Sequence, residues 1–361
     1  MLYAIPRLTR QQLAQLRELD ELRTRLDGET REPRRWVGRL RRQARATAVA
    51  SSTAIEGFTV ADSDALDLVD RVAVVDDGDE DRVAVASYAH ALRHVDALAD
   101  DPSFRWLDRV ILDLHFDACA FHDAKRPGRW RTGPVYVTRA GGGAPAFEGP
   151  SAAQVPKLMR EVVGWLQRGD LDAHPVVRAA MAHLHVVSVH PFEDGNGRVA
   201  RIVQSLVLAR DGVLAPELTS IEEQLGERTA DYYAVLQQVQ GGGYQPQRDA
   251  RPWIAFCLEA HLAQAQRRLR QVADAGSRWG RLEALAEQRG WPERLVIALE
   301  QSLFGAVDRA AYAAEADVSP ATASADFRRL LDAGLVVASG RGRSVRYGAS
   351  ARLRDLAAGR A

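Results

Sequence analysis

The segment from His190 to Arg201, between two predicted helices, most constrains what this chain can fold into. Apolar residues recur at helical spacing over 174–189 before it and over about 197–210 after it. Pro191 lacks a backbone donor, and Gly195 and Gly197 permit tight turns, so the first helix must end near Val189. The sequence therefore predicts a helix, a short loop and a second helix.

The residues of this loop suit it to binding a phosphate. Backbone N–H groups at the start of the second helix favour anions, and glycines allow close approach. Arg198 and Arg201 are three residues apart on one helix face and can address one anion. We expect the following further roles: His190 as general base, Asp194 as a Mg²⁺ ligand, Asn196 as a donor and Phe192 as a buried anchor.

The rest of the chain is predicted to be mainly helical. Leucines repeat at helical spacing from Leu8 to Leu26, and a second helix is expected from Arg34 to about Glu56, ending at Gly57. Further helices are predicted at about 62–74, 81–99, 104–122, 151–168, 219–239 and 249–274. Between them, Val135–Val137 and Ala144–Phe147 are predicted to pair as a hairpin around Gly141–Gly143.

The C-terminal residues have the pattern of a separate module. Helices are predicted at about 294–304, 308–315 and 320–331, the last one capped by Ser319 and stopped by Gly334. Short strands are predicted at 335–338 and 344–347. A helix–turn–helix followed by a hairpin is typical of a winged helix.

Composition excludes several classes. The net charge is zero, so the whole molecule is no electrostatic binder of nucleic acid or membrane. No apolar run is long enough for a membrane span, and the N-terminus lacks the layout of a signal peptide. The separation of Cys119 and Cys257 does not imply a disulfide bond between them. We therefore expect a cytoplasmic protein. The only lysines, Lys125 and Lys157, follow no P-loop pattern.

The loop resembles the signature of the Fic family, which includes the Doc toxins. That signature, H-x-F-x-[D/E]-G-N-G-R-x-x-R, is matched at each fixed position from His190 to Arg201. The likeness extends over roughly 110–240: Val135 to Phe147 fits the family's flap hairpin, preceded by Trp130-Arg131, and Pro156 to Met159 is also family-like. The resemblance implies a mainly α, Fic-type helical bundle with a small β-hairpin flap and, here, a C-terminal winged helix-turn-helix domain.

The resemblance implies transfer of AMP from ATP to a Ser, Thr or Tyr hydroxyl of a protein, including the chain itself. His190 is then the base, Asp194 holds Mg²⁺ between the α- and β-phosphates, and Asn196 with the Gly195–Gly197 backbone stabilises the transferring group. Arg198 binds the β-phosphate and Arg201 the γ-phosphate. Tyr232 and Tyr233 are candidates for the adenine pocket, with an ordinary structural role as the alternative.

One position separates branches of the family. Doc-type kinases carry lysine where this chain has Gly197, and they bind ATP in the reverse sense. Gly197 therefore favours nucleotidyl transfer over phosphorylation.

A second motif, Ser52 to Gly57, resembles the family's inhibitory motif, [S/T]-x-x-x-E-[G/N]. Ser52 and Glu56 are four residues apart and share a helix face. By this resemblance Glu56 pairs with Arg201 and competes with the γ-phosphate for the guanidinium. In some relatives the same glutamate positions a water that removes AMP from the target, which remains an open second activity.

Three domains are predicted: 1–104 as an N-terminal helical region with the inhibitory helix, 105–275 as the catalytic core, and 290–361 as the winged helix. Residues 295–361 carry nine arginines against seven acidic residues, which is a small excess of positive charge for DNA binding.

The rival hypothesis is a DNA-binding regulator whose Fic core senses ATP. An antitoxin-controlled toxin is a third hypothesis, and a homodimer is expected from the family; the target and the nucleotide base are not readable.

Overall fold

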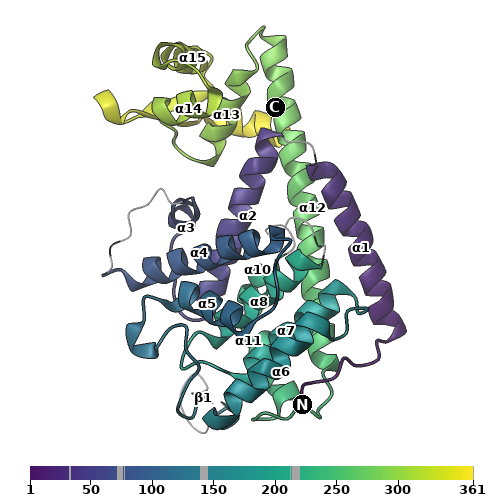
Figure 1. Cartoon of the computed structure of the whole chain (residues 1–361). Coiled ribbons are helices and arrows are strands. Elements are labelled where there is room, and N and C mark those ends of the chain that lie inside the picture. The colour runs from purple at the N-terminus through teal and green to yellow at the C-terminus, as the bar shows by residue number, and fades with distance from the viewer. Residues whose placement is uncertain are drawn as a thin grey trace. The chain divides into compact units, whose positions relative to one another are not determined.

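The computed structural model describes residues 1–31, 34–70, 76, 78–138, 145–211, 213 and 220–360, without the side chain of Arg343. They divide into two compact units, Met1–Leu269 and Arg270–Ala361. The first unit contains α1 (Arg10–Thr30), α2 (Arg35–Ala54), α3 (Asp62–Val69), α4 (Glu80–Asp100), α5 (Asp108–Cys119), β1 (Tyr136–Val137), β2 (Phe147–Glu148), α6 (Val155–Arg168), α7 (Pro175–Val189), α8 (Asn196–Arg210), α10 (Glu222–Glu227), α11 (Thr229–Gln240) and the start of α12 (Arg251–Gln288) (Figure 1).

The first unit is built around α7 and α8. Both helices are buried along nearly their whole length, and they pack against each other, with α4 and α5 against α8 and α6 against α7. Residues on α1, α2 and α4, such as Leu16, Val49 and Tyr88, belong to the same hydrophobic core as α7 and α8. Residues of the predicted N-terminal region, 1–104, therefore share one hydrophobic core with the region predicted as the catalytic core.

The hairpin prediction is confirmed within the described residues. β1 pairs antiparallel with β2, with Tyr136 opposite Glu148 and Val137 opposite Phe147. Glu148 also forms a parallel bridge with Gly243, which ties the hairpin to the end of α11. The Gly141–Gly143 turn and Ala144 lie outside the described residues.

Several helix predictions were wrong in their boundaries. The helix expected at 219–239 is two helices, α10 and α11, separated at Arg228, and the Thr229 hydroxyl donates to the Gly226 carbonyl near the break. The helix expected to end at 274 continues to Gln288, because Leu282 and Ala286 are buried in the core of the second unit despite Gly276 and Gly280 in the sequence. The helix expected at 62–74 ends as α3 at Val69, and 71–74 lie outside the described residues.

The second unit has the predicted order of elements. α13 (Arg294–Phe304), α14 (Arg309–Ala316) and α15 (Pro320–Asp332) precede an antiparallel pair, β3 (Val336–Ser339) and β4 (Arg346–Ala349), and α16 (Ala351–Ala358). The Ser319 side chain accepts from the Thr322 N–H, and Pro320 is the first residue of α15, as the sequence indicates. Tyr312, Phe327 and Tyr347 lie at the centre of its separate core.

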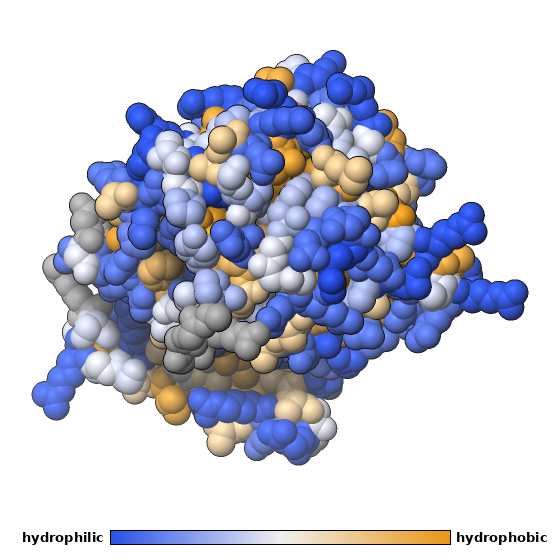
Figure 2. All heavy atoms as spheres, turned by 90° about the horizontal axis from the view of Figure 1, so that it is seen from below, coloured by the Kyte–Doolittle hydropathy of each residue, from blue (hydrophilic) through white to orange (hydrophobic). Residues whose placement is uncertain are grey.

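Within the described part of the chain, no helix combines the length and apolarity needed to cross a membrane. The face shown in Figure 2 is mostly hydrophilic, with hydrophobic residues scattered among polar ones. Cys119 and Cys257 are buried free thiols.

Several buried histidines make the stability of the fold dependent on pH. Burial lowers the pKa of His185 to about 3, and neither ring nitrogen has a hydrogen-bond partner among the described residues. The ordinary histidine pKa in an unfolded chain is about 6.5. The unfolded chain therefore binds the proton first, so the folded state loses stability as the pH falls below about 6.5.

We expect His185→Phe to remove part of this acid sensitivity. Between pH 7 and pH 5 the wild type should lose about 2 kcal/mol more unfolding free energy than the variant, because only the wild type must keep this ring neutral. Urea unfolding at the two pH values measures the difference, and the cost of the substitution at pH 7 cancels. Equal losses in both proteins would show that His185 does not contribute.

Candidate active site

The His190–Arg201 segment forms a tight loop between α7 and α8. His190 ends α7 in the left-handed conformation, with φ 49° and ψ 61°, and Gly195 precedes α8 with φ 75°. A left-handed conformation is uncommon for a residue with a Cβ atom and costs about 1 kcal/mol or more. The surrounding structure must therefore hold His190 in place.

Phe192 and Asn196 close the loop on itself. The Asn196 side chain accepts from the Phe192 N–H at 2.9 Å and donates to the Phe192 carbonyl at 3.0 Å. The Phe192 ring is fully buried and stacks on His115, with 3.6 Å between ring centroids, and Trp130 lies against it. Phe192 is therefore the buried anchor that the sequence predicts. The Asn196 amide has a structural role as well, because it bonds the backbone of the loop.

His115 supports the loop from α5, and no sequence signal indicates it. Its Nδ1 accepts from the Gly128 N–H at 2.8 Å, so its Nε2 carries the proton and donates to the Asp194 carbonyl at 3.1 Å. Burial lowers the pKa of His115 to about 4, which keeps the ring neutral and this donor–acceptor pattern intact at neutral pH. The contact joins residues 79 apart in sequence.

His190 has the protonation pattern that a general base needs. Its Nδ1 lies 3.0 Å from the Val187 carbonyl, which can only accept, so Nδ1 carries the proton. Nε2 is then left with a free lone pair, and His190 lines the largest described cavity, of about 800 Å³. Burial lowers the pKa of His190 to about 4, so the imidazole is neutral at pH 7.

Asp194 and Arg198 pair with each other beside the loop. Arg198 Nη2 donates to an Asp194 carboxylate oxygen at 2.8 Å, and Nη1 donates to the Ala118 carbonyl at 3.3 Å. The guanidinium lies 5.5 Å from the Phe58 ring centre and 5.6 Å from that of Phe121. Arg198 is buried and does not line the cavity, whereas Asp194 does.

The cavity offers a divalent cation the carboxylate of Asp194. Burial raises the pKa of Asp194, but Arg198, the Gly195 N–H and His122 hold it below its ordinary value, so the carboxylate is ionised. The described residues contain no group of three or more metal-ligating side chains. One carboxylate at the cavity matches Mg²⁺, which is commonly bound by one or two carboxylates plus substrate phosphates.

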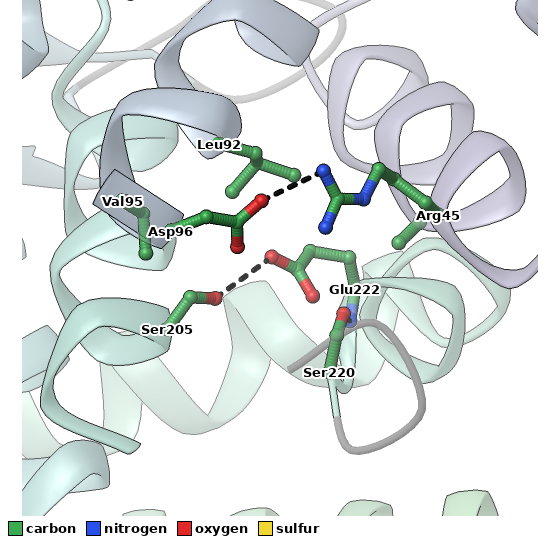
Figure 3. Close-up of a pocket in the computed structure, with 8 residues that line it drawn as sticks. Arg45, Leu92, Val95, Asp96, Ser205, Ser220 and Glu222 are labelled. Carbon is green, nitrogen blue, oxygen red and sulfur yellow. Dashed lines mark hydrogen bonds and ion pairs between the residues drawn. The ribbon is translucent and has the colours of Figure 1, made fainter. Parts of the chain in front are cut away.

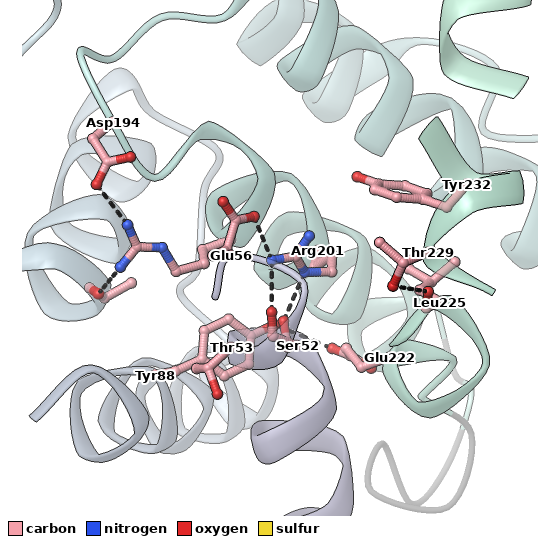
Figure 4. A network of polar contacts seen from close by, with 12 residues as sticks. Ser52, Thr53, Glu56, Tyr88, Asp194, Arg201, Glu222, Leu225, Thr229 and Tyr232 are labelled. Atoms are coloured by element: carbon pink, nitrogen blue, oxygen red, sulfur yellow. Dashed lines mark hydrogen bonds and ion pairs between the residues drawn. The ribbon is translucent and has the colours of Figure 1, made fainter. Parts of the chain in front are cut away.

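Arg201 and the Ser52–Gly57 motif meet as the sequence predicts (Figure 4). Arg201 Nε donates to the Ser52 hydroxyl at 2.6 Å, and Nη2 donates to the Ser52 carbonyl at 3.0 Å and to Glu56 Oε1 at 2.9 Å. Nη1 is buried without a hydrogen-bond partner among the described residues. Burial lowers the pKa of Arg201, but Glu56 and the nearby tyrosines raise it overall, so the guanidinium is charged.

Gly197 makes room for the glutamate. A Cβ atom at this position would lie 2.4 Å from Glu56 Oε1 and 3.2 Å from Arg201 Nη1. The Glu56 carboxylate is therefore packed against the backbone at the start of α8. Gly57, with φ 96°, turns the chain away directly after Glu56.

A buried carboxylate, that of Glu222, lies near Ser52 and Tyr88 (Figure 4) and lines a small cavity (Figure 3). Its Oε1 accepts from the Tyr88 and Ser205 hydroxyls at 3.3 Å each, and burial raises its pKa. Arg45 and Asp96, 2.8 Å apart, line the same small cavity. Sequence reasoning missed Glu222 because nothing in its local pattern indicates burial.

Tyr232 and Tyr233 both line the large cavity, but they differ in environment. Tyr232 is fully buried, and its hydroxyl donates to His183 Nε2 at 3.1 Å, while His183 Nδ1 contacts Gln204 at 2.8 Å. Tyr233 is 43% exposed. His183 thus holds Tyr232 in place, and Tyr233 is free to contact a ligand. The cavity lining that the sequence did not single out includes Ile55, Leu236, Gln237 and Gln240.

In the second unit, Arg328 and Arg329 on α15 and Arg341 and Arg346 near the hairpin are exposed. Asp326 is buried and pairs with Arg294 at 2.8 Å, and the Tyr312 hydroxyl donates to it at 2.8 Å. An internal ion pair therefore holds α15 in its unit, while Arg328 and Arg329 on the same helix are exposed.

Comparisons with known proteins agree with this geometry. Residues 106–208 match the model of the Fic/DOC family. Protein adenylyltransferase fic-1 of Caenorhabditis elegans is 34% identical over 158 residues, 44% of this chain and 27% of the relative. Protein adenylyltransferase Fic of Nematostella vectensis is 28% identical over 239 residues, 62% of this chain and 52% of the relative. This chain thus spans about a quarter to a half of the length of these relatives.

Solved structures share the fold. A Fic family protein from Desulfovibrio desulfuricans matches with a TM-score of 0.62 and 23% identity, over 96% of this chain and 98% of that one. A fragment of Fic-1 from C. elegans matches with a TM-score of 0.57 and 24% identity, over 73% of each chain. The mainly helical fold is therefore that of Fic-family structures.

Proposed function

We propose, from the membership of residues 106–208 in the Fic/DOC family, that this chain is a protein adenylyltransferase restrained by its own Glu56. The observation that carries the proposal is the shared cavity: His190, Asp194 and the Gly195–Gly197 backbone line it together with Glu56. The curated relatives named as protein adenylyltransferases support the reaction class.

The reaction follows from the protonation of His190. Its free Nε2 takes the proton of a Ser, Thr or Tyr hydroxyl on the target protein, and the oxygen attacks the α-phosphorus of ATP. The bond from that phosphorus to the bridging oxygen breaks, and diphosphate leaves. Backbone N–H groups at the start of α8 offset the charge that develops on the phosphoryl oxygens.

Asp194 is the residue that would hold Mg²⁺, and the ion, when bound, neutralises charge on the ATP phosphates. The Asp194–Arg198 contact places a guanidinium next to the metal ligand. We assign Arg198 to the β-phosphate side and Arg201, through its partnerless Nη1, to the γ-phosphate. Tyr233 and the apolar lining of α11 are assigned to the adenine ring.

Restraint follows from competition for Arg201. Glu56 and Ser52 occupy Nη2 and Nε, so a γ-phosphate has access to two nitrogens of the guanidinium only after the glutamate has moved. Glu56 also lines the cavity, which supports removal of AMP by a glutamate-bound water as a second activity of the same site.

Intact-mass analysis of Glu56→Gly after incubation with each nucleoside triphosphate and Mg²⁺ tests the reaction and the donor together. We expect a gain of one AMP from ATP. No gain from any nucleotide, or a gain of one phosphate, would contradict adenylyl transfer. A gain of another nucleoside monophosphate would keep the reaction class and change the donor.

DNA binding by residues 295–361 is a second candidate, favoured by the exposed arginines of α15 and the hairpin. A mobility-shift assay at physiological salt, with Arg328 and Arg329 replaced by alanine as the comparison, tests it. Unchanged mobility of duplex DNA with the wild type would leave a protein-docking role for this unit.

A further inference from the structure

Arg131 is a buried cation whose role the proposed reaction does not explain. Its side chain is only 3% exposed, yet no ion pair with a carboxylate is found for it in the described part of the chain. Burial lowers the pKa of Arg131. A buried charge without a counter-ion is costly and is retained only where its hydrogen bonds compensate.

The compensation consists of backbone carbonyls from three separate segments. Arg131 Nε donates to the His190 carbonyl at 2.7 Å, Nη1 donates to the Gly133 carbonyl at 2.8 Å, and Nη2 donates to the Pro150 carbonyl. The Arg131 backbone N–H also donates to the Pro191 carbonyl at 2.9 Å. One side chain and its own backbone therefore bind both residues at the turn into the loop and both ends of the hairpin.

The hydrogen bond from Arg131 to His190 stabilises the residue of the loop that has a strained backbone. His190 has φ 49°, and an unstrained alternative would turn its carbonyl and ring away. Two donors from residue 131, Nε and the backbone N–H, bind the carbonyls of His190 and of Pro191. These bonds help to hold the left-handed turn, and with it the direction in which His190 Nε2 points.

The hydrogen bonds from Arg131 to Gly133 and Pro150 stabilise the hairpin. Gly133 precedes β1 and Pro150 follows β2, so a single guanidinium bridges the two ends of the hairpin. Gly149 makes the bridge possible: a Cβ there would lie 3.0 Å from Arg131 Nη2 and 2.6 Å from a Val135 methyl. The glycine has no positive φ, so its small size is what the contact needs.

We propose that Arg131 is a positioning residue that locks His190 and the β1–β2 hairpin into one rigid body. The inference rests on the proposed function, in which His190 takes the proton of a hydroxyl presented beside the hairpin. The clamp sets the distance between base and hydroxyl and leaves nucleotide binding unaffected. Only a planar fork with donors in three directions can bridge these carbonyls, so lysine cannot replace it.

The activity test uses the full chain with Glu56→Gly as the parent. Arg131→Lys keeps the charge and removes the fork, and Arg129→Lys, at an exposed neighbour, is the matched control. We expect kcat for self-modification to fall about 100-fold in Arg131→Lys only, the size of effect that a displacement of about 1 Å produces. The Kd for a non-hydrolysable ATP analogue should stay that of the parent.

Two activity results would overturn the proposal. If Arg131→Lys retains the kcat of the parent, charge alone suffices and the fork is irrelevant. If the Kd of the analogue rises as much as kcat falls, Arg131 acts on the nucleotide and not on the geometry of the base.

Hydrogen exchange tests the clamp without activity. We expect Arg131→Lys to speed exchange both at the hairpin, where the Gly149 N–H bonds the Val135 carbonyl, and at the loop around residues 190–192. Gly149→Ala crowds the guanidinium as well as a Val135 methyl and leaves Arg131 in place, so faster exchange at residues 190–192 in addition to the hairpin is the informative result. Faster exchange at one segment only, or at neither, would refute a shared clamp.

The two arms also separate this inference from the proposed function. A parent that transfers no nucleotide would refute the function, and the exchange pattern would still decide the clamp. Thermal melts followed by circular dichroism identify any variant that unfolds as a whole. If Arg131→Lys unfolds, hydrogen exchange of Gly149→Ala tests the clamp in its place.

Discussion

Glu56→Gly should raise self-modification by about 100-fold over the wild type, provided that the chain is an adenylyltransferase. Glu56 bonds a guanidinium that is only 1% exposed, and removing one partner of a buried pair changes the free energy by roughly 3 kcal/mol, which corresponds to about two powers of ten. Residue 56 lies beyond the end of α2 at Ala54, so glycine there breaks no helix. Transfer of label from [α-³²P]ATP, followed on a gel, measures the change.

Glu56→Gln is the informative comparison. It keeps the length and an acceptor oxygen but removes the charge, so release intermediate between wild type and glycine would identify the ion pair as the main restraint. Equal labelling of wild type and Glu56→Gly would eliminate restraint by Glu56, even though the two side chains touch.

His190→Ala in the Glu56→Gly background should lower self-modification by about 10² to 10⁴, the usual contribution of a general base. The structure ties this to one atom, Nε2, because Nδ1 is engaged with the Val187 carbonyl. The Kd for a non-hydrolysable ATP analogue should change little, since the imidazole addresses the acceptor hydroxyl. Single-turnover labelling and calorimetric titration measure the two quantities.

His90→Ala, at an exposed position on α4, serves as the control for loss of a histidine. Undiminished labelling of the His190→Ala protein would mean that another group takes the proton, and the assignment of the base would be wrong.

The loop and its flanking helices were predictable because their signals are local. Gly195, Gly197 and the apolar periodicity on either side decide a turn between helices whatever surrounds them, and the observed α7 and α8 lie within one residue of the predicted ranges. The capped start of α15 at Ser319-Pro320 is local in the same way. The end of α12 could not be predicted in this way. The helix continues past Gly276 and Gly280 because Leu282 and Ala286 are buried in the core of the second unit, and that core exists only in the folded structure.

The chemistry of the individual loop residues depended on distant partners. Asn196 is expected to donate to a ligand, and the structure adds that its amide is bonded to the backbone of Phe192. Arg198 is expected at the β-phosphate, and the structure adds that it is buried beside two aromatic rings with Asp194 as its partner. His115 and Glu222 carry no local signal, and Arg131 is indicated only by its place before the hairpin, since the partners of these side chains include residues far away in sequence.

The sequence by itself determined the residue types at the loop, the helices that carry it and the pairing expected between Glu56 and Arg201. The loop and its helices follow from backbone preferences and from a motif whose members are close in sequence, whereas the pairing of Glu56 with Arg201, which joins residues 145 apart, was expected from the resemblance to the Fic family. Only the tertiary structure decided which ring nitrogen of His190 is free, that Arg201 Nη1 has no hydrogen-bond partner among the described residues, and that Arg131 binds three carbonyls. The reason is physical: burial and hydrogen-bond direction are set by which segments pack together, and no single segment contains that information.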